Sequence, residues 1–310
     1  MNDRFKFSLR NQFVETIRSE HTRSRIEEVH ADTLRSRTSK GLLILGPSGV
    51  GKTTLIKDCI KTMFQDRDIP GKKLTALHVD MPSSPSKKSL ASALLENLGD
   101  QFASSRHHSA EAKFQRVVVL LKNLGVEILI IDEVQHVIDS GRATAYEAAD
   151  WIKDLMNKLQ ITVVLVGLKR TEGLLRANEQ LRRRFSASVV YDRYSYSAGD
   201  DYVQFSGLVQ AIQGILPVTA IAFHDEVVLR RLYHSTYGLI DYLMKILDRA
   251  VWLVQSRVTE GIDLTVLAEA FRDEVWSLVP DLRNPFTPDF NFEPLIGSGE
   301  PFEDFDSSKA

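Results

Sequence analysis

The stretch "LLILGPSGVGKTTL", residues 42–55, decides the fold. Its first four residues are apolar and have the length of a fully buried strand. Residues 46–53 follow as a glycine-rich run that matches G-x-x-x-x-G-K-[ST] at every fixed position. Glycines let successive N–H groups point at one anion, and the helix expected to follow directs its positive end to the same place. The stretch therefore predicts a binding site for nucleotide phosphates.

The residue types within this run indicate the chemistry. Lys52 would reach the β- and γ-phosphates of ATP, and the Thr53 hydroxyl would ligate Mg²⁺. A turn that uses glycine only for its conformational freedom is the alternative, but the strand before it and the helix after it favour phosphate binding. The residues expected to bind ATP are Gly46, Pro47, Ser48, Gly49, Val50, Gly51, Lys52, Thr53 and Thr54.

The composition is that of an ordinary globular chain. The 310 residues suffice for one large domain or two modest ones, and 43% of them are hydrophobic. The formal net charge of −2 excludes a protein that is basic overall, so any contact with nucleic acid depends on a local patch. Cys59 is the single cysteine, and no apolar stretch approaches the roughly 18–20 residues of a membrane span. We expect a bacterial cytoplasmic protein without a membrane contact.

Strands alternate with helices through the first two thirds of the chain. The expected strands are 42–45, 74–80, 127–133, 161–167 and 186–191, and helices are expected over 87–103, 109–124 and 144–159. This alternation predicts an α/β fold with a parallel sheet covered on both faces. Ligands of such sheets bind beyond the carboxyl ends of the strands.

Four regions are expected along the chain. Residues 1–40 predict an N-terminal helical arm, either solvated or in contact with a neighbouring subunit or DNA. Residues 41–198 form the nucleotide-binding α/β core, and residues 199–280 form a small helical lid domain. Residues 281–310 hold four of the ten prolines and five of the fifteen phenylalanines, so we expect a disordered acidic tail that either docks on a partner or only aids solubility.

The stretch "ILIIDEVQH" bears on whether the phosphate is hydrolysed. In this stretch Asp132 and Glu133 lie at the end of an expected strand. Asp132 would hold Mg²⁺ opposite Thr53, and Glu133 would orient and deprotonate an attacking water. A P-loop kinase does not need this second acid, because the hydroxyl of its substrate is the nucleophile. The pair therefore favours an ATPase, and Gln135 or His136 would sense the γ-phosphate or line a subunit junction.

Three consecutive arginines, residues 182–184, stand just before the fifth expected strand. Cations at the end of a helix suit its dipole, which is the structural interpretation. The functional interpretation is an arginine finger supplied to the γ-phosphate of another subunit. Since consecutive side chains on a helix point in different directions, at most one or two of the three serve this purpose.

These stretches together resemble the AAA+ ATPases. The stretches GPSGVGKTT, ILIIDEVQH, VVLVGLKRTEGLLRANEQLRRRF and YGLIDYLMKILDRA carry the resemblance, over about residues 5–275. Within the AAA+ class the chain is similar to the TniB/TnsC-type regulators of DNA transposition, including those of Tn-seven-like and CRISPR-associated transposons. The resemblance implies a P-loop AAA+ core with a helical lid, and it matches Arg184 best to the finger position, with Arg183 next.

Two positions depart from the pattern of many AAA+ proteins. Leu168 follows the fourth strand, where a polar residue often senses the γ-phosphate. The lid helix after Gly238 has Tyr242 and no arginine within reach of the nucleotide. The resemblance with these departures implies slow hydrolysis, which suits a switch whose ATP-bound state persists.

The resemblance also implies partners. Proteins of this kind bind ATP and Mg²⁺, form rings or helical filaments on double-stranded DNA, recruit a transposase and bind a TniQ-type targeting protein. The side chains that match the DNA-contacting region are Lys87, Lys88, Arg106, Lys113 and Arg116, and a solvated charged helix face is the alternative for each. We expect hydrolysis to drive disassembly of the oligomer.

Two other classes remain open. An initiator or helicase-loader ATPase shares these motifs, but it usually adds a winged-helix module for which residues 279–310 are too few and too rich in proline. A signalling NTPase shares them as well, but it usually appends repeats or effector domains.

Overall fold

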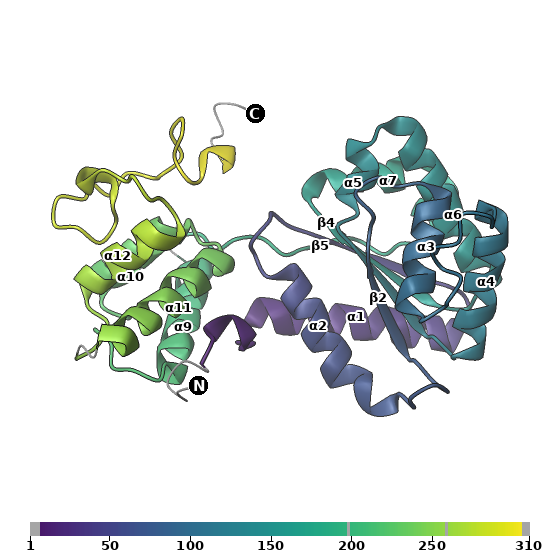
Figure 1. Cartoon of the computed structure of the whole chain (residues 1–310), viewed down its shortest axis with the longest axis horizontal. Coiled ribbons are helices and arrows are strands. Elements are labelled where there is room, and N and C mark those ends of the chain that lie inside the picture. The colour runs from purple at the N-terminus through teal and green to yellow at the C-terminus, as the bar shows by residue number, and fades with distance from the viewer. Residues whose placement is uncertain (1–6, 197–198, 258–259, 306–310) are drawn as a thin grey trace. The chain divides into compact units, whose positions relative to one another are not determined.

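The computed structural model describes residues 7–196, 199–257 and 260–305 and divides the chain into two compact units (Figure 1). The core unit comprises Arg18–Ser48 and Lys52–Asp192. The helical unit comprises Met1–Ile17, Gly49–Gly51 and Arg193–Ala310. The tip of the glycine-rich loop is thus grouped with the helical unit, although both of its stems belong to the core unit.

The core unit is built on a parallel sheet with the strand order β2-β3-β4-β1-β5. Every residue of β1, β3 and β4 is buried, as expected for strands that are covered on both faces. The register places Asp80 beside Asp132 at the carboxyl ends of β2 and β3. The strands are β1 (Gly41–Leu45), β2 (Ala76–Asp80), β3 (Ile128–Asp132), β4 (Thr162–Gly167) and β5 (Val189–Val190). The predicted α/β fold with a parallel sheet is confirmed.

Helices cover both faces of this sheet (Figure 1). The chain crosses the sheet in one direction from β1 to β2 and in the other from β2 through β3 to β4, so right-handed connections place α2 on one face and the later helices on the other. α1 (Ile17–Ser36) lies on the same face as α2 (Lys52–Met63). The opposite face carries α3 (Lys87–Asn97), α4 (Ala110–Asn123), α6 (Arg142–Lys158), α7 (Glu172–Ala177) and α8 (Glu179–Arg182), with α5 (Gln135–Asp139) after β3.

The helical unit contains α9 (Asp200–Ile215), α10 (Glu226–Thr236), α11 (Ile240–Arg257) and α12 (Leu264–Glu274). The short 3-10 helix Leu9–Asn11 joins them from the N-terminal side, because the buried Leu9 donates its N–H to Asp248 Oδ1 at 2.5 Å. Within the described residues, no helix combines the length and the apolar character needed to cross a membrane.

The C-terminal segment, residues 281–305, packs on the helical unit. Phe286, Phe290 and Phe302 are buried, and the Phe286 ring meets the ring of Phe271 on α12 at 6.3 Å. The expectation of a disordered tail is therefore wrong for this segment. Its phenylalanines are spaced so that several bury against the helices at once, which offsets the entropy lost on ordering the chain. Residues 306–310 lie outside the described residues.

Candidate nucleotide-binding site

The glycine-rich loop joins β1 to α2 at the carboxyl edge of the sheet. Gly49 and Gly51 have φ angles of +78° and +94°, a left-handed conformation that favours glycine at both positions. α2 begins at Lys52, so the unpaired N–H groups of its first turn face this loop. A curled backbone followed directly by a helix N-terminus is the arrangement with which P-loops bind phosphates.

The side chain of Lys52 folds back into the loop. Its Nζ donates hydrogen bonds to the carbonyl oxygens of Gly46 at 2.8 Å and Pro47 at 2.7 Å, and the residue is 8% exposed. Burial lowers the pKa of the Lys52 amine, while the charges of Asp132 and Glu133 act in the opposite direction. The amine is held where it can exchange two neutral carbonyl oxygens for phosphate oxygens, which form stronger, charge-assisted bonds.

Thr53 and Asp132 come together beside Lys52, as their proposed role as Mg²⁺ ligands requires. Thr53 Oγ1 donates to Asp132 Oδ2 at 2.6 Å, and Asp132 is fully buried at the end of β3. A hydroxyl and a carboxylate are the oxygen ligands that a hard divalent cation prefers, so this pair fits Mg²⁺.

The ionisation of Asp132 is secured by its neighbours. Burial acts to raise the pKa of Asp132, but hydrogen bonding from His78, Thr53 and the Glu133 backbone outweighs it and holds the pKa below its usual value. The Glu133 N–H donates to Asp132 Oδ1 at 2.8 Å. The carboxylate therefore stays charged, as a cation ligand must.

Glu133 occupies an unusual backbone conformation. Its φ angle is +56°, which costs about 1–2 kcal/mol for a residue other than glycine. Its carboxylate accepts a hydrogen bond from Gln135 Nε2, and Gln135 Oε1 accepts one from the Leu168 N–H at 3.3 Å. Gln135 thus fixes the carboxylate of Glu133 and links it to the end of β4.

His78 is a further residue of this edge, which is not among the site residues predicted from the sequence. Its Nε2 lies 3.8 Å from Asp132 Oδ2 and 3.8 Å from Asp80 Oδ1, and the three side chains could hold a metal ion. The signal was present in the sequence, because His78 stands two positions before Asp80 on one strand and so faces the same side of the sheet.

The three arginines lie at the end of α8, with Arg182 as its last residue and Arg183 and Arg184 directly after it, all within the core unit. Arg184 Nη2 donates to Asn157 Oδ1 at the end of α6, and Arg183 pairs with Glu179 at 2.7 Å. Arg182 and Arg183 are exposed, and Arg184 is half-buried. The run is therefore accessible at the surface, and Arg184 is bonded to a residue of a different helix.

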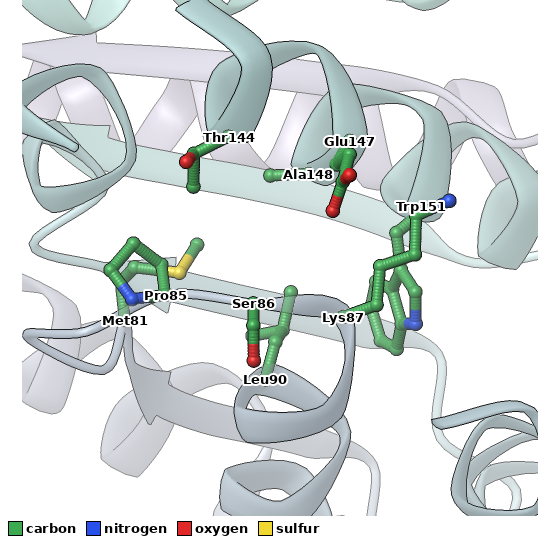
Figure 2. A pocket seen from close by; sticks show the side chains of 9 residues that line it. All are labelled: Met81, Pro85, Ser86, Lys87, Leu90, Thr144, Glu147, Ala148 and Trp151. Atoms are coloured by element: carbon green, nitrogen blue, oxygen red, sulfur yellow. The ribbon is translucent and has the colours of Figure 1, made fainter. Parts of the chain in front are cut away.

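The basic residues proposed for DNA fall into two groups. Lys88 and Arg106 lie together, since Lys88 Nζ donates to the Arg106 carbonyl at 3.0 Å. Lys87 is half-buried and lines a small, mainly apolar pocket between residues 81–90 and α6 (Figure 2), with its Nζ 3.8 Å from Asp150 Oδ2. These three side chains lie at or near the surface.

Lys113 and Arg116 both bond to groups of their own chain, Lys113 from a buried position and Arg116 with a side chain that is 42% exposed. Lys113 is 2% exposed, and its Nζ donates to Ser92 Oγ at 2.7 Å and to the Ala103 carbonyl at 2.5 Å. The prediction that Lys113 contacts DNA is therefore wrong in this conformation, because a buried amine with protein acceptors does not reach a phosphate. Arg116 pairs with Asp100 at 2.6 Å and also lies over the ring of Phe102.

Comparisons with known proteins identify the family of the chain. The family model of the bacterial TniB protein matches residues 4–195. The chain belongs to the TniB family. The match spans the glycine-rich loop, both carboxylates and the arginine run of this TniB-family chain. No curated protein matches it.

Solved structures show the fold of this TniB-family protein. Cdc6p from Pyrobaculum aerophilum matches with a TM-score of 0.65 at 12% identity, over 93% of this chain and 80% of that chain. Orc1 from Aeropyrum pernix, solved in complex with DNA, matches with a TM-score of 0.64 at 19% identity, over 84% of this chain and 66% of that chain. Orc2 from the same organism matches with a TM-score of 0.63 at 16% identity, over 89% of this chain and 72% of that chain. The chain therefore has the P-loop AAA+ fold, and it spans just under two thirds of the Orc1 chain.

Proposed function

We propose that this TniB-family protein is an ATPase that assembles on double-stranded DNA, recruits a transposase and disassembles when ATP is hydrolysed. The observation that carries the proposal is the convergence of Lys52, Thr53, Asp132 and Glu133 at the carboxyl edge of one sheet. Family membership supports the transposition role, and a TniQ-type targeting protein is the second proposed partner.

Each residue of the edge has a part in hydrolysis. Lys52 binds the β- and γ-phosphates, and Mg²⁺ held by Thr53 and Asp132 would neutralise charge on the same oxygens. Glu133 takes a proton from the water that attacks the γ-phosphorus, and the bond from this phosphorus to the oxygen of the departing ADP breaks. Gln135 holds the Glu133 carboxylate, and neither Leu168 nor Tyr242 offers the usual sensor group, so we propose slow turnover.

We propose that Arg184 completes the site of a neighbouring subunit in a homo-oligomer, with Arg183 as the second candidate. A cation aimed at the γ-phosphate from outside the subunit would make hydrolysis depend on assembly. The half-buried Arg184 would exchange its bond to Asn157 for a phosphate oxygen. Lys87, Lys88, Arg106 and the partly exposed Arg116 are the proposed DNA contacts, binding phosphates without sequence preference.

Electron microscopy of the purified chain tests this proposal directly. The chain is imaged with a slowly hydrolysed ATP analogue, with and without a short duplex. We expect rings or filaments only when both nucleotide and duplex are present. Nucleotide-bound monomers that ignore DNA would contradict the proposal and favour a signalling NTPase.

A mixing experiment tests the subunit that supplies the arginine. Lys52→Ala removes phosphate binding but leaves Arg184 intact, and Arg184→Ala does the reverse. We expect each variant alone to lose about 10³-fold or more of the ATPase rate, and the mixture to recover activity at interfaces that combine the two intact residues. Arg182→Ala is the matched control and should keep its rate. A mixture no more active than its parts would contradict a finger acting between subunits.

The similarity to Orc1 and Cdc6p makes replication initiation or helicase loading the second candidate function. An initiator or helicase loader would share the fold and the nucleotide site. A strand-transfer assay separates the two functions: ATP and this chain together should increase insertion by a transposase from the same element. Loading of a replicative helicase in place of that effect would favour the second function.

A further inference from the structure

The C-terminal segment, residues 281–305, ends against the turn that precedes α11. Phe302 is 1% exposed, and its ring stacks on Tyr237 with centroids 5.7 Å apart and an interplanar angle of 16°. The same ring meets Tyr242 edge-on at 5.2 Å and 89°. Tyr237 and Tyr242 stand on either side of residues 238–241, so Phe302 contacts both flanks of this turn.

The turn itself depends on its packing. Tyr237 caps α10 with a φ angle of +51°, an unfavourable conformation for a residue with a bulky side chain. Gly238 has a φ angle of +78°, and a Cβ atom there would lie 2.0 Å from the Tyr194 carbonyl oxygen. A turn with strained backbone persists only where its surroundings hold it, and Phe302 is part of those surroundings.

The turn contacts the tip of the glycine-rich loop, which belongs to the same helical unit. The Asp241 N–H donates to the Gly49 carbonyl at 2.9 Å. Because the peptide unit is planar, fixing the direction of the Gly49 carbonyl also fixes the Val50 N–H, which points the opposite way. The hydrogen bond from Asp241 therefore sets the orientation of one of the N–H groups that the loop offers to a phosphate.

The rest of the segment fixes the place of Phe302. Arg283 donates to both carboxylate oxygens of Glu300, at 2.7 Å each, and so closes the segment into a loop. The Phe302 N–H donates to the carbonyl of Leu295, which is fully buried, at 3.0 Å. These bonds position the ring from within the segment, independently of the two tyrosines.

We propose that Phe302 is a positioning residue for nucleotide binding: by holding Tyr237 and Tyr242 it keeps the turn at residues 238–241 bonded to Gly49. The inference rests on the proposed function, since it takes ATP as the ligand of the loop. It makes the C-terminal segment a regulatory element of the nucleotide site. By linkage, a bound nucleotide stabilises the docked segment to the same extent that the docked segment favours the nucleotide.

A pair of phenylalanine variants isolates this effect. Phe302→Ala and Phe286→Ala each remove one buried ring from the same segment, but Phe286 packs on Phe271 and has no ring contact with Tyr237 or Tyr242. Affinity for a fluorescent ATP analogue and stability in urea are measured for both variants. We expect similar losses of stability, with at least about a fivefold loss of affinity for Phe302→Ala alone. Phe302→Leu keeps apolar volume against the tyrosines and should restore most of the affinity.

Hydrogen exchange provides a readout that a purely structural role would not change. In the wild type, the ATP analogue should slow amide exchange at residues 295–305, and in Phe302→Ala this protection should be lost. Equal affinities for the two alanine variants, or exchange that does not respond to nucleotide in a wild type that binds it, would overturn the inference. A wild type that binds no ATP analogue would instead overturn the proposed function.

Discussion

Lys52 and Lys113 are both buried lysines, and the regions around them use charge in opposite ways. At the sheet edge, the amine of Lys52, the hydroxyl of Thr53 and the carboxylates of Asp132 and Glu133 converge on one place. In the layer formed by α3 and α4, Lys113 donates hydrogen bonds to Ser92 and Ala103, and Arg116 forms an ion pair with Asp100. Four polar side chains that meet at one edge of the sheet suit a ligand, whereas Lys113 and Arg116 each meet a separate set of partners, which suits a structural role.

Substitutions should therefore separate the two regions. Changes at the sheet edge should alter nucleotide chemistry and leave stability nearly unchanged, since we propose that these groups serve a ligand. Changes in the layer of α3 and α4 should alter stability and leave nucleotide binding unchanged.

Glu133→Gln should give the largest effect. It removes the proposed base and keeps the shape of the side chain, so we expect the ATPase rate to fall about 10²- to 10⁴-fold while the affinity for ATP stays the same. Oligomers formed with ATP should persist instead of dispersing. The rate is measured by phosphate release and the assembly by light scattering.

A glutamate of the second region provides the control. Glu111 on α4 also accepts a hydrogen bond from a glutamine side chain, that of Gln115 at 2.5 Å. Glu111→Gln should leave the ATPase rate unchanged. Equal effects of the two substitutions would remove the contrast between the regions, and loss of oligomers in Glu133→Gln would contradict hydrolysis as the step that disassembles them.

Lys52→Met should give the second largest effect, a loss of ATP affinity. A hydrogen bond to a charged group contributes about 1.5–3 kcal/mol, so we expect about a 10- to 150-fold loss of affinity, measured by titration with a fluorescent analogue. The unfolding midpoint without nucleotide should change less than the affinity, because burial disfavours the charged amine of Lys52, and removing that amine offsets the loss of its two bonds to the loop carbonyls. A large loss of stability with affinity intact would assign Lys52 to structure.

Lys113→Met is the converse test. The methionine keeps apolar volume but leaves Ser92 Oγ and the Ala103 carbonyl without the amine that donates to them. Of these two acceptors the Ala103 carbonyl is buried, and leaving it unsatisfied costs about 1–3 kcal/mol, which should appear as a lower free energy of unfolding in urea. ATP affinity and DNA affinity should stay at their wild-type values. Weaker DNA binding by Lys113→Met with unchanged stability would contradict this prediction and would identify Lys113 as a DNA contact.

The sequence predicted best what is local. The glycine-rich loop and the pair Asp132-Glu133 are contiguous motifs at strand ends, and a parallel sheet places both at the same edge. Lys113 shows what was overlooked: with Val117 and Leu121 it follows the i, i+4, i+8 spacing of one helix face, and both of those residues are fully or nearly fully buried. Its burial could have been predicted from that spacing.

Other features depend on contacts between distant parts of the chain. The bond from Arg184 to Asn157 and the contacts of Phe302 with Tyr237 and Tyr242 join residues whose sequences give no sign of each other. The C-terminal segment was misjudged for this reason. Its acidic, proline-rich composition is typical of disorder, and only the surface offered by the helical unit makes its phenylalanines core residues.

Substitution of the surface residue Lys88 should give the smallest effect. The salt dependence of DNA affinity in that variant decides whether a charge near α3 contacts DNA. Lys88→Ala removes a cation beside Arg106 without opening the core, since its Nζ contacts only the Arg106 carbonyl among the described hydrogen bonds. If Lys88 neutralises one phosphate, the slope of log affinity against log salt concentration should become less steep by about 0.9. Lys72 is exposed in the turn before β2, at the opposite end of that strand from Asp80, so Lys72→Ala should leave the slope unchanged. An unchanged slope in Lys88→Ala would move the DNA contacts away from α3, because a lost phosphate contact must release one fewer counterion whatever the sequence of the duplex.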